Sequence, residues 1–394
     1  MMPTEPRELC DVCELIVDCE HKTAPAQKTG YPSIRTPNIG RGRLILDGVN
    51  RVSEETYRAW SRRASPRGGD LILAREAPIG NVAIIPDNLK ICLGQRTVLI
   101  RPDRNQVDPN YLVYLLLGDE VQGKFQSYAS GATVPHLNLR DIRNLELPPL
   151  PPLPTQRKIA AILSAYDDLI ENNTRRIAAL EEMAQLLYRE WFVYFRFPGH
   201  EHVPMVDSDL GPIPEGWEVV KVKAIVRRLK AGRRYKKAGV SETGQVPVID
   251  QSHDTILGFH NNEPDHQATP ESPIIIFGDH TCKMQLMVEP FSVGPNVVPF
   301  VSQDNIPITY LYFLVNNLVE TQEYKRHWTE LTNKQIVLAP NMYTEQFPIF
   351  ARPIFAQIDS LTRRNMVLRR TRDLLLPRLI SGEVDISELE PLND

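Results

Sequence analysis

Two interleaved lines of mostly apolar residues run through residues 155–192, and each line repeats every seven positions. The spacings between the lines alternate between three and four, which is typical of the seam of a coiled coil. A polar residue on this seam, Asn173, would lower stability but fix the register of the paired helices. At a rise of ~1.5 Å per residue the predicted helix is roughly 55 Å long, so we expect it to act as a strut. The seam positions assigned to it are Leu163, Ile170, Asn173, Ile177, Leu180, Leu187 and Trp191.

A similar pattern returns in residues 355–381 and predicts a second long helix that pairs antiparallel with the first. Leu180 and Leu187 map onto Leu368 and Leu375 at a constant offset of 188. We infer two copies of a domain-then-helix unit; the alternative is two ordinary amphipathic helices in separate domains. The seam positions of the second helix are Ile358, Leu361, Asn365, Leu368, Leu375 and Leu379.

The composition is that of a globular protein, with 42% hydrophobic and 24% charged residues among 394. This length allows two or three domains with real cores. No apolar run is long enough to cross a bilayer, and the first residues do not form a basic-then-apolar signal sequence. A cytoplasmic protein with no membrane partner is the simplest expectation.

The net charge of −4 does not by itself indicate a nucleic-acid-binding protein, but the charges are segregated along the chain. Arginines crowd residues 35–67, and arginines and lysines crowd residues 227–237, whereas the two helical segments carry many of the acids. For contact with a phosphate backbone, the sign of the local charge matters more than the net charge of the whole chain. The alternative for each basic run is a solvated surface.

Three of the five cysteines lie near the start of the chain, at Cys10, Cys13 and Cys19, with His21 beside them. This set offers four possible zinc ligands. Val12, Leu15, Ile16 and Val17 lie between them and predict a buried helix or strand rather than the turns of a zinc knuckle. We therefore favour reduced structural thiols and no metal.

The remaining pattern predicts an α+β fold with four segments: a first domain at 1–150, a central helix at 151–197, a second domain at 198–350, and a C-terminal helix and tail at 351–394. Short apolar runs bounded by Gly and Pro predict the irregular β-sheets of both domains. The predicted strands are 70–74, 80–85, 97–101, 246–249, 274–277 and 297–301, and the predicted helices are 56–63, 110–125 and 310–319. Residues 147–154 are proline-rich and predict an extended lead-in that ends at Thr155, the expected N-cap of the first strut.

Motifs for catalysis are weak in this sequence. It has neither a phosphate-binding loop nor a dinucleotide fingerprint, and it lacks the Asn- or Asp-Pro-Pro-aromatic motif of an adenine methyltransferase. Glu323 and Lys325, with the distant Asp265, match half of a nuclease signature, which chance explains better. Residues 277–280 resemble a metal or base cluster, although a strand-end turn with Asp and His is common.

The chain resembles a known family, the specificity subunits of type I restriction-modification systems. In the first domain the resemblance depends on the sequences at 18–25, 69–80 and 93–96, and at the onset and end of the strut on 154–160 and 191–193. In the second domain it depends on 212–217, 248–252 and 276–280, and near the end of the chain on 373–383. Each of these sequences alone is weak evidence for the family. Their occurrence in this order, in both halves of the chain, is specific to it.

The resemblance implies two target-recognition domains, each reading one half of a split site on double-stranded DNA, with the helices setting the gap. It further implies that two DNA methyltransferase (modification) subunits dock on the helices and that restriction subunits add cleavage. S-adenosylmethionine, ATP and magnesium would then belong to those partners, and this chain would be non-catalytic and hold no cofactor.

Candidate DNA-contacting residues are chosen from their chemistry, because Arg and Lys neutralise phosphates while Arg, Asn, Gln and His reach base edges. His21, Gln95 and Asp279 are set apart as side chains that the fold can bury and satisfy. The candidates in the first domain are Lys22, Arg35, Asn38, Arg41, Arg43, Arg96, Thr133, His136 and Asn138. Those in the second domain are Arg233, Arg234, Lys236, Gln251, His253, His280, Lys283 and Lys334. Two other classes of function remain open: a stand-alone nuclease or methyltransferase, and a coiled-coil scaffold whose end domains bind proteins.

Overall fold

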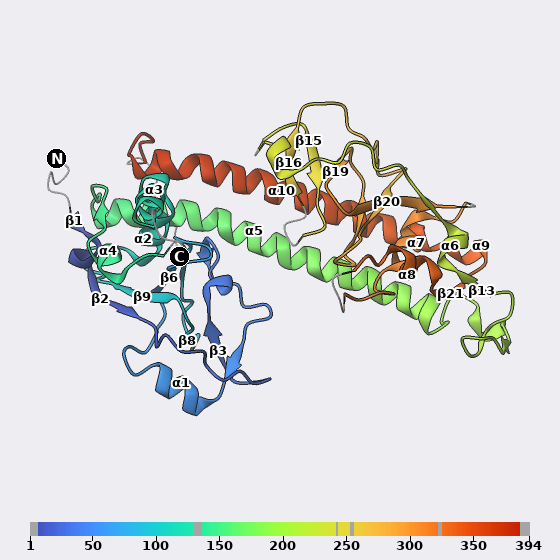
Figure 1. Ribbon diagram of the computed structural model, residues 1–394, viewed down its shortest axis with the longest axis horizontal. Coiled ribbons are helices and arrows are strands. Elements are labelled where there is room, and N and C mark those ends of the chain that lie inside the picture. Colours follow the sequence, from blue (N-terminus) through green and yellow to red (C-terminus); the bar gives the residue numbers. More distant parts are fainter. Residues whose placement is uncertain are drawn as a thin grey trace. The chain divides into compact units, whose positions relative to one another are not determined.

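The structure is a computed structural model that describes residues 7–129, 136–241, 243–252, 256–303, 305–321 and 325–386. Helices and strands alternate irregularly along the chain, and the predicted α+β class is confirmed (Figure 1). The chain divides into two compact units, Met1–Asn172 with Arg364–Asp394 and Asn173–Arg363. The first unit is thus built from two separated stretches of chain, and the second unit is inserted between them.

The first unit contains a five-stranded sheet in the order β2-β9-β6-β7-β4 and a three-stranded sheet in the order β5-β3-β8. A short pair, β1 and β10, joins the start of the unit to the segment before its long helix. The strands are β1 (Arg7–Glu8), β2 (Cys13–Asp18), β3 (Tyr31–Ile34), β4 (Gly42–Arg43), β5 (Arg51–Val52), β6 (Leu71–Ala74), β7 (Val82–Ile84), β8 (Cys92–Leu93), β9 (Thr97–Pro102) and β10 (Glu146–Leu147). The helices before the long one are α1 (Glu54–Trp60), α2 (Pro109–Leu117), α3 (Asp119–Tyr128) and α4 (Leu139–Arg143).

Strand β6 shows why a continuous apolar run forms the centre of this sheet. Successive side chains of a strand point to opposite faces. Leu71 and Leu73 accordingly enter the core that contains α2, while Ile72 and Ala74 enter a second core on the other face. Both faces of the strand are buried, so alternation with polar residues is absent.

The single helix predicted at 110–125 is two helices in the structure. Gly118 has extended backbone angles, and it both ends α2 and begins α3. The side chain of Gln122 donates to the carbonyl oxygen of Leu116 at 2.7 Å, which satisfies an end of α2 that the break leaves open. Periodicity alone did not reveal this break, because the apolar pattern continues across it.

The long helix α5 spans Leu153–Tyr188, so the prediction that Thr155 is its N-cap is wrong by one turn. Pro154 is tolerated in the first turn because its missing N–H has no helical partner there. Gln156 secures this end of the helix: its amide nitrogen donates to the carbonyl of Pro151 at 2.8 Å, and its amide oxygen accepts from the N–H of Asp108 at 2.9 Å. A π-helical turn at Arg189–Val193 follows α5.

The second unit contains a four-stranded sheet in the order β14-β20-β17-β18 and a three-stranded sheet in the order β16-β15-β19. Two further pairs, β13 with β21 and β11 with β12, complete its strands. The strands are β11 (Met205–Val206), β12 (Ile213–Pro214), β13 (Glu218–Lys221), β14 (Val226–Arg228), β15 (Val246–Ile249), β16 (Ile256–His260), β17 (Ile274–Gly278), β18 (Met284–Met287), β19 (Ser292–Val293), β20 (Val297–Ser302) and β21 (Gln335–Leu338). The helices are α6 (Val222–Ile225), α7 (Ile308–Val315), α8 (Trp328–Asn333), α9 (Asn341–Thr344) and α10 (Phe347–Ile380), and α10 extends into the first unit.

The pairing of strands follows the same plan in both units. In each, an antiparallel pair of central strands (β6 with β9, β17 with β20) is extended by a further antiparallel strand on either side. In each, a small sheet combines one antiparallel and one parallel pairing (β5-β3-β8 and β16-β15-β19). The alternation of side chains also recurs, since Ile275 and Phe277 enter one core and Ile274 and Ile276 the other.

Both long helices contribute to both units, and within each unit they are described separately. In the first unit the Asn365 amide of α10 donates to the carbonyl of Ile170 on α5 at 3.3 Å, and Leu163 shares a core with Leu379. The two segments therefore run antiparallel here. In the second unit, Trp191, just past the end of α5, packs edge-on against Phe347 at the start of α10, with ring centroids 6.3 Å apart.

Helix α10 begins at Phe347, eight residues before the predicted start at 355, and it accommodates both Pro348 and Pro353 near its N-terminal end. Every position assigned to the seam of either helix is buried or half-buried. Within the described part of the chain, none of the helices combines the length and apolarity that a bilayer crossing requires.

Candidate nucleic-acid interface

Three segments of the first unit meet where its central strands end. Arg75 directly follows β6, and Arg96 directly precedes β9. The backbone N–H of Arg75 donates to the carbonyl of Arg96 at 3.0 Å, and the N–H of Leu137 donates to the carbonyl of Arg75 at 3.0 Å. These bonds bring Arg96 and His136, two predicted contact residues, to one place.

The side chain of Arg75 is the centre of this meeting point. It is only 6% exposed, and it donates to the carbonyl of Leu137 at 2.7 Å, to the carboxylate of Asp18 at 2.7 Å and to Nε2 of His136 at 2.6 Å. A guanidinium is always charged, so burial is tolerable only because the opposite charge of Asp18 and directional acceptors surround it.

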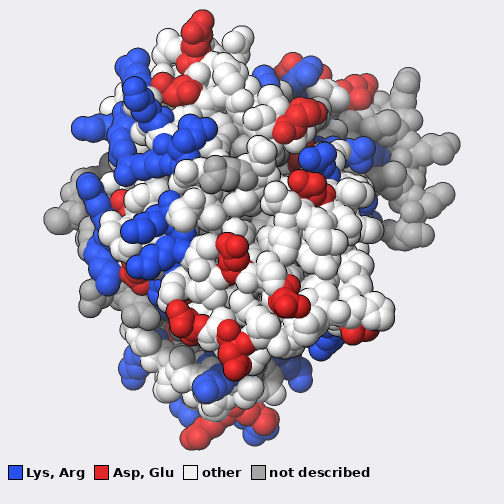
Figure 2. All heavy atoms as spheres, turned by 90° about the vertical axis from the view of Figure 1, so that its right-hand side faces the viewer, with Lys and Arg blue, Asp and Glu red and all other residues white. Residues whose placement is uncertain are grey.

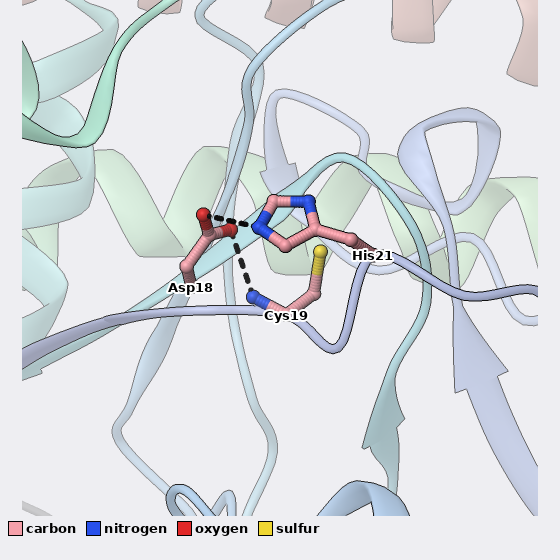
Figure 3. Close-up of side chains that lie close together, drawn as sticks. All are labelled: Asp18, Cys19 and His21. Carbon is pink, nitrogen blue, oxygen red and sulfur yellow. Dashed lines mark hydrogen bonds and ion pairs between the residues drawn. The ribbon is translucent and has the colours of Figure 1, made fainter.

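Asp18 receives further donors from its own segment, as Figure 3 shows. The ring of His21 contacts its carboxylate at 2.8 Å, and the N–H of Cys19 donates to it at 2.9 Å. Among the described residues, Asp18, Cys19 and His21 are the group whose ligand atoms lie close enough together to hold a metal. Cys10 and Cys13 are not part of that group, so the four-ligand set considered from the sequence is not assembled. The Arg75 cation already neutralises Asp18, which opposes a cation there.

Glu76 and His136 complete the network. The Glu76 carboxylate, 9% exposed, pairs with Arg96 at 2.9 Å and lies 3.7 Å from Nδ1 of His136. Burial, followed by the neighbouring Arg75 cation, lowers the pKa of His136 below the ordinary value for histidine. Because Arg75 donates to Nε2, the neutral ring carries its proton on Nδ1, facing Glu76.

Backbone strain concentrates in this network. His21, Ala77 and Arg96 all have positive φ angles, of 55°, 46° and 67°. Side chains with a Cβ rarely adopt this region, and strain of this kind clusters at functional sites. The carbonyl of Arg96 accepts from the N–H of Arg75, and the carbonyl of His21 accepts from the side chain of Gln95.

The basic segment at residues 35–43 contains four predicted contact residues, and two of them also make contacts within the fold. Asn38 is buried; its amide nitrogen donates to the carbonyl of Ile45 at 3.2 Å, and its oxygen accepts from the N–H of Arg35 at 3.1 Å. Arg43 is ion-paired with Asp168 and Glu171 of α5. Asn38 and Arg43 thus make contacts within the fold, and their role in contacting DNA stays a prediction.

The other candidates of the first unit keep their charged or polar ends at the surface. Lys22 and Arg35 are exposed, and exposed Arg41 contacts the carbonyl of Leu117 at 3.3 Å. Asn138 is exposed and donates to Asp141 at 3.0 Å. Thr133 lies outside the described residues.

The basic loop of the second unit leads into β15. The guanidinium of Arg233 lies over the ring of Tyr235, 4.9 Å from its centroid, and the Arg233 N–H donates to Asp265 at 3.1 Å. Arg234 and Lys236 are exposed beside it. Figure 2 shows Lys and Arg side chains gathered along one side of the surface that it presents, with Asp and Glu mostly elsewhere. Asp265, considered from the sequence as a nuclease acid, also accepts from the Ser292 hydroxyl at 2.8 Å, whereas Glu323 lies outside the described residues.

Asp279 directly follows β17 and is a buried charged residue at the ends of the central strands of the second unit. Its carboxylate, 8% exposed, accepts from the N–H groups of His327 and Trp328 at 3.1 and 2.9 Å and lies 3.9 Å from the guanidinium of Arg326. The backbone N–H of Asp279 donates to the carbonyl of Asn296 at 2.8 Å, and that of His327 donates to the carbonyl of Asp279 at 2.8 Å.

The predicted contact residues of the second unit border this point. The Gln251 oxygen accepts from the N–H of His280 at 3.0 Å, and His280 Nδ1 contacts the carbonyl of Lys325 at 3.0 Å. Exposed Lys283 donates to the carbonyl of Ser252 at 3.2 Å. Exposed Lys334 lies 3.8 Å from Glu330, and His253 lies outside the described residues.

Sequence reasoning missed Arg75, Glu76 and Asp18 as organisers of the first site. A signal was present, because a charged pair directly follows the buried strand β6. The sequence search favoured basic clusters and exposed loops, whereas these residues act from inside the fold.

Comparison with known proteins provides a further set of findings. The family model described as the type I restriction modification DNA specificity domain matches residues 1–182. The type I restriction enzyme MjaIX specificity subunit of Methanocaldococcus jannaschii is 27% identical over 370 residues, covering 88% of this chain and 84% of the relative. The putative MjaX specificity subunit of the same organism is 30% identical over 307 residues, covering 75% of this chain and 69% of the relative. The crystal structure of the type I restriction-modification S subunit from M. genitalium shares the fold, with a TM-score of 0.55, 16% identity and coverage of 96% of both chains.

Proposed function

This chain belongs to the family of type I restriction enzyme specificity subunits, and from that premise we propose that each of its two units reads one half of a bipartite site on double-stranded DNA. The observation that carries the proposal is the repetition of one strand plan in both units, with predicted contact residues at the same strand ends in each. A polypeptide with two similar DNA-reading units is better suited to a site made of two short sequence elements than to a site made of one long element.

The proposed contacts divide by chemistry. Exposed basic side chains, among them Arg35, Arg234 and Lys236, would neutralise phosphates and supply affinity that falls with salt. Side chains at the strand ends, such as His136 and Gln251, would face base edges, because polar groups held in fixed positions can discriminate between bases.

We further propose that α5 and α10 form a coiled coil that sets the number of base pairs between the two half-sites. The support is that each helix contributes residues to both units and that the seam positions are buried or half-buried. A rigid helix suits this role because its length per residue is fixed.

The same helices are the proposed docking surface for two DNA methyltransferase subunits. Large apolar side chains remain more than half exposed on the helices, although apolar side chains usually enter a core. These exposed side chains include Leu169, Met183, Val367 and Leu374.

We propose that this chain is not itself a catalyst. Its sequence carries no motif for methyl transfer or nucleotide hydrolysis, so S-adenosylmethionine, ATP and magnesium would act in the methyltransferase and restriction subunits. A cytoplasmic location follows from the proposed DNA target and partners.

The test is to express the chain with the methyltransferase subunits of its own system and to sequence the methylated DNA of the host. The expected result is methylation of one bipartite motif, which disappears when this chain is omitted. A matched insertion of seven residues in α5 and α10 preserves the seam pattern and should lengthen the unread spacer by about one to three base pairs. Methylation without this chain, or turnover by the pure chain alone, would contradict the proposal.

A further inference from the structure

The same set of backbone contacts occurs at the strand ends of both units. In each, a residue directly after one central strand donates its N–H to the carbonyl of the residue directly before the other central strand. The carbonyl of that first residue accepts from a third residue shortly before a short helix. In the first unit these are Arg75, Arg96 and Leu137, and in the second they are Asp279, Asn296 and His327. Arg96 and Asn296 also share a positive φ, of 67° and 60°.

The charged side chains at this shared position have opposite signs. Arg75 is a buried cation that holds Asp18, His136 and the carbonyl of Leu137. Asp279 is a buried anion that holds the backbone N–H groups at the start of α8 and lies beside Arg326. The backbone frame is therefore common to both units, while the groups that it orients differ.

We propose that Arg75 and Asp279 are positioning residues for base discrimination, one in each unit. This inference rests on the proposed function, because it assumes that each unit reads DNA. Arg75 would fix His136 and the chain leading to Asn138, and Asp279 would fix Arg326 and the chain leading into α8.

Neither residue is suited to contact DNA itself. Arg75 is 6% exposed, and its Nε, Nη1 and Nη2 atoms all have acceptors within the fold. Asp279 is 8% exposed and carries the same sign as a phosphate. Both must therefore act through the residues that they hold, and fixed geometry is what a directional base contact requires.

Arg75→Lys and Asp279→Ala test the proposal in the complete complex with its methyltransferase subunits. Lysine keeps the charge of Arg75 but cannot make three directional bonds in one plane. The probes are duplexes carrying the site found by methylation sequencing, with substitutions in one half or the other. We expect Arg75→Lys to reduce discrimination by about tenfold in one half only, and Asp279→Ala to do so in the other half only. Affinity for unrelated DNA and its salt dependence should stay unchanged.

Controls separate positioning from general destabilisation. Arg101→Lys is matched to Arg75→Lys, because Arg101 also bonds a buried carboxylate in the same unit, that of Asp70, at 2.9 and 2.7 Å. It should leave discrimination intact. Asp279→Asn retains an acceptor for the backbone N–H groups and should restore discrimination lost in Asp279→Ala.

A double variant guards against a folding defect in Arg75→Lys. If Arg75 acts through His136, then His136→Ala alone relaxes the same half, and adding Arg75→Lys changes it little further. Equal loss in both halves, or full discrimination in the folded single variants, would overturn the inference. Failure of the wild-type complex to discriminate in either half would instead overturn the proposed function.

Discussion

The guanidinium of Arg372 on α10 donates to the buried carboxylate of Asp167 on α5, although the two residues are 205 positions apart in the chain. The hydroxyl of Tyr114 donates to the other oxygen of the same carboxylate at 2.6 Å. Three elements of the first unit are thus joined at one side chain. The negative charge of Asp167 also contributes, after burial, to raising the pKa of Tyr114, which therefore remains a donor.

Asp167→Ala should lower the free energy of unfolding of the first unit by about 3 kcal/mol, because it removes the buried carboxylate that the half-buried Arg372 cation and the Tyr114 hydroxyl share as an acceptor. Urea unfolding followed by circular dichroism measures the change. Glu54→Ala is the control, since it removes an exposed pair with Arg58 and should change stability by less than about 1 kcal/mol. Equal effects of the two variants would show that the Asp167 cluster is not a structural joint.

Phe347→Ala should lower the free energy of unfolding of the second unit by about 3 to 5 kcal/mol. The Phe347 side chain is fully buried, and its ring contacts those of Tyr188, Trp191 and Phe192 with centroids 5.5 to 6.3 Å apart. Phe350→Ala is the matched control, because Phe350 is 53% exposed one turn further along α10. A loss for Phe350→Ala as large as for Phe347→Ala would contradict this account of the core.

The free energy of unfolding of the first unit should fall as the pH drops below about 6.5, because protonation of His136 is less favourable in the folded state. The fold lowers the pKa of His136, first by burial and then by Arg75, while Glu76 and Asp18 act weakly in the opposite direction. The unfolded chain therefore takes up a proton before the folded chain, so stability is complete above the unfolded pKa and is lost as pH falls toward the folded one. Thermal melts at pH 7.5 and 5.5 should differ less in His136→Gln than in the wild type. His21→Gln is the comparison variant, because the exposed His21 ring contacts the carboxylate of Asp18.

Arg234→Gln and Lys236→Gln should each reduce the slope of log affinity against log salt by about 1, with little change in the preferred sequence. Both side chains are exposed in the basic loop of the second unit. Arg196→Gln is the control, because Arg196 is paired with Glu190 at 3.1 Å and lies outside that loop. An unchanged slope in both variants would remove this loop from the proposed DNA contact.

Much of the fold was predictable from the sequence because burial leaves periodic patterns. The runs at 71–74, 274–278 and 297–302 are strands as expected, since apolar residues without breaks favour a doubly buried strand. The two long helices were predicted from their seven-residue repeats. Their starts were less predictable, because proline is tolerated in a first turn and marks no definite boundary.

The candidate site was less predictable because basic side chains have two uses. Arg43 and Arg35 look alike in sequence, yet Arg43 pairs with α5 and Arg35 remains exposed. That difference depends on acids more than a hundred positions away, which no local pattern reveals. Arg75 was missed for the opposite reason, since its partners are polar groups brought together only by the fold.

The insertion of the second unit within the chain of the first has a consequence for synthesis on the ribosome. Leu376, Leu379 and Ile386 belong to the same core as Leu9 and Tyr111, so residues made before the second unit must wait for residues made after it. A nascent chain emerging at roughly 5–20 residues per second therefore exposes an incomplete apolar surface for many seconds. The inserted second unit can fold before the first unit, whose core is completed only when the stretch after the insertion has been made.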